Sequence, residues 1–117
     1  MFYGEMMAGS IEVDGKLWTA ASWLFRWVVS SVADHAGLDA DGQARLREIV
    51  DENLGWLSID GLEPARRSIV RDWISERLVA DADARLPVDL EADRAATLTH
   101  LGELAQMTSQ NHDGDGE

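Results

Sequence analysis

The chain has 117 residues and carries 22 Asp and Glu against 10 Lys and Arg, which gives a formal net charge of −12. This length, with 45% hydrophobic residues, predicts one small folded domain and not a disordered chain. The absence of Cys excludes a disulfide scaffold and Cys-based metal sites, and the negative charge disfavours direct binding to nucleic acid or to an anionic membrane.

The only β-like pattern lies in residues 1–16. Residues 11–13 alternate between apolar and polar, and Asp14-Gly15 is a strong two-residue turn signal. Two interpretations fit this segment. It is either a short hairpin whose return strand begins at 16–18, or an irregular N-terminal arm packed on helices, because an isolated hairpin is only marginally stable.

Neither a secretory signal nor a membrane span is expected. Residues 1–7 lack a basic region, and the most apolar window, 17–33, is shorter than the roughly 20 residues that cross a bilayer. We therefore expect a cytoplasmic location and no membrane association.

The apolar segment 17–36 predicts the first helix. Aliphatic and small residues recur there at helical spacing, and Trp18, Trp23 and Trp27 fall on the remaining faces. A helix that is apolar on nearly every side must be enclosed by other elements or by a second chain. We expect Trp18 and Trp23 to be partly exposed or buried between chains, so that the three Trp residues form a self-association surface.

A second helix is expected after the stop signal at Gly37. Asp39 or Asp41 can cap its first turn, and an apolar stripe follows from 46 to 57. The sequence therefore predicts a helix across this stripe, whose end is weakened by Gly55.

Two more helices complete the predicted elements. Pro64 suits a first helical position, Trp73 lies in the apolar stripe of the third helix, and this helix must stop before Pro87. The fourth helix is expected to open near Asp89. The polar, Gly-rich residues 111–117 predict a flexible acidic tail.

The predicted fold class is all-α. We expect a compact antiparallel bundle of about four helices, with a short hairpin or arm at its N-terminus, because the helices are joined by short connections. One helical domain then spans residues 1–110.

Residues 37–48 partly match a calcium-binding EF-hand loop. Asp39 and Asp41 take its third and fifth positions and Glu48 its twelfth, but Gly37 stands where the first carboxylate belongs. An ordinary turn with a Gly stop and an Asp cap explains the same residues. We therefore expect no metal and no cofactor, and keep the two Asp residues and Glu48 as weak candidates.

No catalytic motif stands out, so we expect no enzymatic activity and name no catalytic residue. There is no Gly-x-Ser-x-Gly elbow and no phosphate-binding glycine loop after a strand. His100 and Glu103 form a solitary i,i+3 pair. Arg66, Arg67 and Arg71 form a basic cluster that is either an anion contact or a solvated face neutralised by carboxylates, and the net charge favours the second interpretation.

Small, acidic, Cys-free helical proteins of this kind resemble bacterial antitoxins, toxin-immunity proteins and nucleic-acid mimics in size and charge. That resemblance implies a non-catalytic module, antitoxin-like, immunity-like or inhibitor-like, that binds a basic protein partner. The expected partner-binding residues are the carboxylates Asp34, Asp39, Asp41, Glu48, Asp51 and Glu52. The alternatives are a homodimeric regulatory or scaffold protein joined through the Trp-rich first helix, and a weak metal-binding protein or small enzyme.

Overall fold

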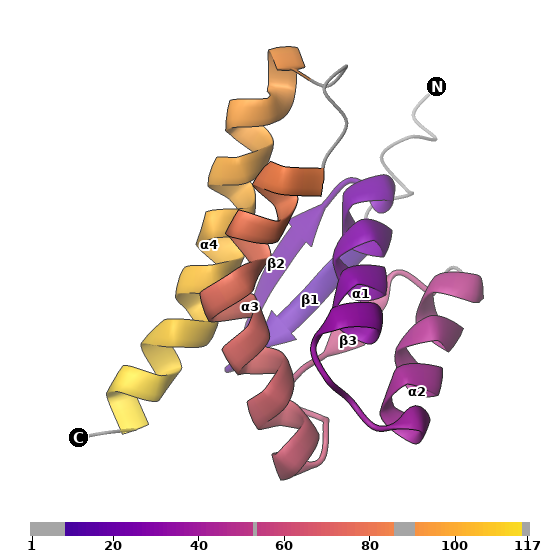
Figure 1. The fold of residues 1–117 in the computed structure, drawn as a ribbon. Coiled ribbons are helices and arrows are strands. Elements are labelled where there is room, and N and C mark those ends of the chain that lie inside the picture. The colour runs from indigo at the N-terminus through magenta and orange to yellow at the C-terminus, as the bar shows by residue number, and fades with distance from the viewer. Residues whose placement is uncertain (1–8, 53, 86–90, 116–117) are drawn as a thin grey trace. The chain divides into compact units, whose positions relative to one another are not determined.

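The computed structural model describes residues 9–52, 54–85 and 91–115 (Figure 1). The described chain is mostly helical and also contains a small three-stranded sheet, of which the all-α prediction allowed only an N-terminal hairpin and not the third strand. Its elements are β1 (Gly9–Val13), β2 (Lys16–Ala20), α1 (Ser22–His35), α2 (Ala40–Asp51), β3 (Trp56–Ser58), α3 (Pro64–Arg85) and α4 (Glu91–Asp115). They divide into two compact units, Met1–Val70 (unit 1) and Arg71–Glu117 (unit 2).

The sheet of unit 1 confirms the hairpin interpretation. β1 and β2 pair antiparallel, and β3 adds to the other side of β1 in parallel, giving the strand order β2-β1-β3. Asp14 and Gly15 form the turn with φ of 56° and 78°, the left-handed conformation that tight hairpins need. The Asp60 carboxylate accepts hydrogen bonds from both turn amides, at 2.7 Å from Asp14 N and 2.9 Å from Gly15 N, and so fastens the turn to the segment after β3.

The first helix begins at Ser22, so the prediction of a helix from residue 17 is wrong. Leu17 and Thr19 are exposed while Trp18 and Ala20 are buried, which is the two-residue alternation of a strand. Four residues are too few to distinguish this alternation from helical spacing, and the neighbouring turn decides in favour of the strand.

The second helix also differs from its prediction, because it ends at Asp51. Gly55 has φ of 70°, which breaks the helical path, and residues 56–58 then form β3. The predicted apolar stripe therefore continues into a strand, in which Leu57 is buried and Trp56 is exposed.

One face of the sheet, the inner sheet face, contacts α1. Its buried residues are Gly9, Ile11, Val13, Trp18, Ala20 and Leu57. Phe25 of α1 is 1% exposed and lies against Gly9, where a Cβ atom would meet the ring. α2 packs on α1 and buries Leu46. The core of unit 1 therefore lies between the inner sheet face, α1 and α2.

The opposite face, the outer sheet face, is exposed or half-buried. The strand registers place six residues on it: Ser10, Glu12, Leu17, Thr19, Trp56 and Ser58. Leu17 is 56% exposed and Trp56 is 47% exposed. The sheet therefore has one face in the core and one face toward solvent.

In unit 2, the described parts of α3 and α4 lie side by side (Figure 1). Arg71 Nη2 donates to the Thr108 carbonyl at 2.5 Å, and Arg94 Nη2 pairs with Asp83 Oδ1 at 3.2 Å. Early residues of one helix thus meet late residues of the other, as in two neighbouring helices of opposite direction. The antiparallel arrangement of all four helices stays a prediction.

Several features of α3 and α4 were predicted. α3 begins at Pro64 and ends before Pro87, and Trp73 is 9% exposed, so its core position is confirmed. Arg71 is only 8% exposed, which corrects its assignment to a solvated face, since its guanidinium is satisfied by a carbonyl inside unit 2. α4 extends to Asp115, so the predicted tail at 111–117 begins within this helix and its flexibility stays a prediction.

Candidate functional site

Residues 37–48 form a turn and a helix, not a calcium loop. Gly37 has φ of 90°, and Asp39 caps α2 by accepting a hydrogen bond from Gly42 N at 3.1 Å. Glu48 lies about 10 Å along the helix axis from Asp41, since seven residues separate them. The weak metal candidates therefore do not converge, and Asp39 acts as the helix cap of the ordinary turn that the sequence favours. No group of three or more His, Asp or Glu in the described residues could hold a metal ion.

The Arg66 side chain forms ion pairs with both Asp residues of this turn. Arg66 Nη2 lies 3.1 Å from Asp39 Oδ2 and 3.0 Å from Asp41 Oδ2, and its Nη1 lies 3.9 Å from Glu63 Oε1. The hydrogen bond from Arg66, joined by that from the Gly42 amide, lowers the pKa of Asp39 below its ordinary value of 3.8. For Arg66, the interpretation of a basic residue neutralised by nearby carboxylates is confirmed.

This pairing makes part of the stability depend on pH. Because the pKa of Asp39 is lower in the folded chain, its ionised form favours folding above the ordinary pKa, and the contribution is lost as pH falls through the folded value. We expect Arg66→Met to lower the free energy of unfolding at neutral pH, and the difference from the native chain to shrink as pH falls below 3.8.

Urea denaturation across this pH range checks the expectation. Asp39→Asn is the matched control, because Asn still caps a helix but carries no charge for Arg66. In that background the pH dependence of the Arg66 substitution should be smaller. A stability difference that stays constant with pH would contradict the assignment.

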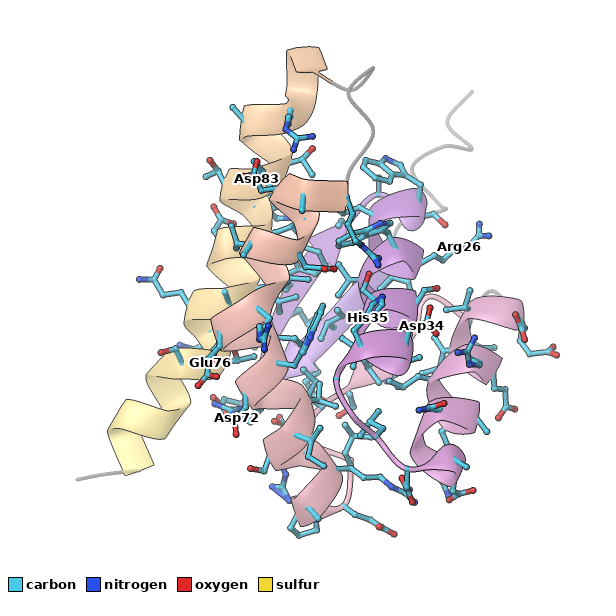
Figure 2. The ribbon with its side chains drawn as sticks, in the orientation of Figure 1. Arg26, Asp34, His35, Asp72, Glu76 and Asp83 are labelled. Atoms are coloured by element: carbon cyan, nitrogen blue, oxygen red, sulfur yellow. The ribbon has the colours of Figure 1, made fainter. Side chains whose placement is uncertain are left out.

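The two basic residues of α2 form two further ion pairs. Arg47 pairs with Asp34 at the end of α1, and Arg45 Nε lies 3.8 Å from Asp41 Oδ2 one turn away. Figure 2 shows Asp34 at the α2 side of α1. Three of the six predicted partner-binding carboxylates, Asp34, Asp39 and Asp41, are therefore already opposed by arginines of the same chain.

The other three predicted carboxylates, Glu48, Asp51 and Glu52, form a set that we call the acidic end of α2. All three are exposed, and no ion pair is recorded for them within the part of the chain that the structure describes. They lie at the C-terminal end of the helix, where the helix dipole is already negative. Glu48 and Glu52 are also four residues apart, a spacing at which like charges repel.

Two large apolar side chains follow the acidic end of α2 directly. Leu54 is 56% exposed and Trp56 is 47% exposed. Four residues of chain span at most about 14 Å, so the Trp56 backbone lies within that distance of the Glu52 backbone. Exposed Trp residues are enriched at protein-interaction surfaces. The sequence pattern does not single out Trp56 as a site residue, although Gly55 before it signals the break from helix to strand.

The predicted self-association residues do not form one exposed surface. Trp18 is 3% exposed on the inner sheet face, so its predicted exposure is wrong. Trp27 is half-buried and Trp23 is 45% exposed. Self-association through these residues stays a prediction, with Trp23 as its most accessible member.

Unit 2 contains a shallow groove that is lined by few reactive side chains. The groove is lined by Ser75, Thr99, Gly102, Glu103, Ala105, Gln106 and Ser109. Among the described lining residues Glu103 alone is titratable, and its carboxylate lies 3.1 Å from His100 Nδ1. The pair of His100 and Glu103 does not place a nucleophile beside a general base.

Comparisons with models of protein families, with curated proteins and with solved structures found no match for this chain. Among the described helices, none combines the length and apolar character needed to cross a bilayer.

Proposed function

We propose that this protein is a non-catalytic, acidic interaction module that binds a basic protein partner through the acidic end of α2 and the adjacent Leu54 and Trp56. One observation carries the proposal: arginines of the same chain oppose three of the predicted carboxylates, while Glu48, Asp51 and Glu52 have no recorded counter-charge in the described residues. A cationic partner would relieve their mutual repulsion.

The charge of the whole chain supports the same proposal. A net charge of −12 attracts cationic proteins over distances of about one Debye length and repels nucleic acid. A fast, salt-sensitive encounter suits an antitoxin-like, immunity-like or inhibitor-like protein, the class that the sequence suggests, acting in the cytoplasm.

Charge reversal at the acidic end of α2 tests the proposal. We expect Glu48→Lys combined with Glu52→Lys to weaken the binding of an oligoarginine peptide by about tenfold, because two attractive charges become repulsive. Isothermal titration calorimetry at low ionic strength measures this, and rising salt should weaken binding to the native chain.

Asp72→Lys combined with Glu76→Lys is the matched control. Both residues are exposed on α3, four residues apart, and the charge changes by the same amount (Figure 2). The control should lose only about twofold through the lower net charge. Equal losses in both variants would mean that the peptide responds to net charge alone, which would contradict the proposed site.

A second candidate function is a homodimeric regulatory or scaffold protein. The 45% exposure of Trp23, a large aromatic side chain of α1, is the observation that supports it. Sedimentation that gives a monomer at high concentration would remove this candidate.

A further inference from the structure

We infer that the outer sheet face holds a binding site for an arginine side chain of the basic partner, with its guanidinium stacked on the Trp56 indole and paired with the Glu12 carboxylate. This inference rests on the proposed function and deepens it, because it names the side chain that is recognised.

The strand registers bring the two residues together. Glu12 lies opposite Ser58 in the parallel pair of β1 and β3, and Trp56 lies two residues before Ser58 on the same face. Strand spacing and rise place the Cα atoms of Glu12 and Trp56 about 8 Å apart. A guanidinium over the indole therefore lies within reach of the Glu12 side chain.

Glu12 is held in place on this face. Ser58 Oγ donates a hydrogen bond to Glu12 Oε1 at 2.7 Å, which orients the carboxylate along the strand pair. No donor to the second oxygen, Oε2, is recorded in the described residues. This oxygen is available to accept a hydrogen bond from a guanidinium, which donates in a planar fork that suits carboxylates.

The site is accessible, and its charge selects the occupant. Trp56 is 47% exposed, and α1 contacts the opposite face of the sheet. A second copy of this chain would bring Glu12 against Glu12 and add another charge of −12, so self-association is opposed here. A cation that stacks on indole is complementary to this face, and arginine stacks on aromatic rings better than lysine.

Oligoarginine and oligolysine peptides of equal length and charge distinguish guanidinium stacking from simple charge attraction. We expect the native chain to bind oligoarginine about threefold or more tightly than oligolysine, because the planar guanidinium stacks on indole and pairs with a carboxylate better than an ammonium does. Trp56→Leu should abolish the preference while retaining binding of both peptides. Trp56→Phe should keep part of it, since the aromatic face remains.

Calorimetry with the two peptides gives distinguishable outcomes. Equal affinities for both peptides in the native chain would overturn the arginine site and leave the proposed function standing. A preference that survives in Trp56→Leu would overturn the role of Trp56. Binding of neither peptide would overturn the proposed function and this inference together. Circular dichroism confirms that each variant retains the native fold.

Discussion

Replacing Phe25 with Ala is expected to lower the free energy of unfolding by about 3–5 kcal/mol, the range for truncating a buried Phe. Phe25 is 1% exposed on the face of α1 that lies against Gly9 of β1. The substitution removes the ring that joins the helix to the inner sheet face and leaves a cavity that the close-packed core cannot fill completely.

Urea denaturation measures this loss, and the next residue along the chain supplies the control. Arg26 is exposed on α1 (Figure 2), and Arg26→Ala should change stability by no more than about 0.5 kcal/mol. A loss of unfolding free energy below about 1 kcal/mol for Phe25→Ala would show that α1 does not pack on the sheet through this ring.

The second large effect is expected at Gly9. A Cβ atom there would lie 2.2 Å from Phe25 Cγ and 2.5 Å from Phe25 Cβ. These atoms are close to the α1 backbone and cannot swing aside, so Gly9→Ala must push the helix away from β1. We expect a loss of about 1–3 kcal/mol, as for other overpacked cores.

Gly102→Ala is the matched control for this substitution. A Cβ at Gly102 meets nothing within 4 Å, and the residue lies inside α4. Ala is the better helix former, so this variant should gain up to about 1 kcal/mol. Thermal or urea unfolding of both variants checks the opposite signs. A neutral Gly9→Ala variant would contradict the close approach of β1 and α1.

The parts of the fold that the sequence predicted have local causes. The turn at Asp14-Gly15, the cap at Asp39 and the helix start at Pro64 each depend on residues within a few positions of one another. Such signals depend only on neighbouring residues, so they can be recognised in the sequence before the tertiary structure is known.

The parts that were missed depend on distant partners. β3 has three residues and no turn of its own, and it is a strand because β1 lies beside it, with 46 positions between Ser10 and Trp56. The apolar spacing of residues 17–20 suits either a helix or a strand, so the sequence alone does not decide between them. Pairing of Ile11 with Trp18 resolves that ambiguity.

The candidate site could be predicted only in part for the same reason. The sequence shows six clustered carboxylates but not which arginines reach them. Arg66 comes from 27 positions beyond Asp39, and Arg47 from 13 positions beyond Asp34. Only the fold therefore separates the neutralised carboxylates from the acidic end of α2.

Mapping a bound oligoarginine by amide chemical shifts tests whether a cationic partner binds at the acidic end of α2. We expect the largest shift changes at low ionic strength to fall on this end of the helix and on residues 54–58. Changes centred on Asp72 and Glu76, or spread evenly over all exposed carboxylates, would contradict this expectation.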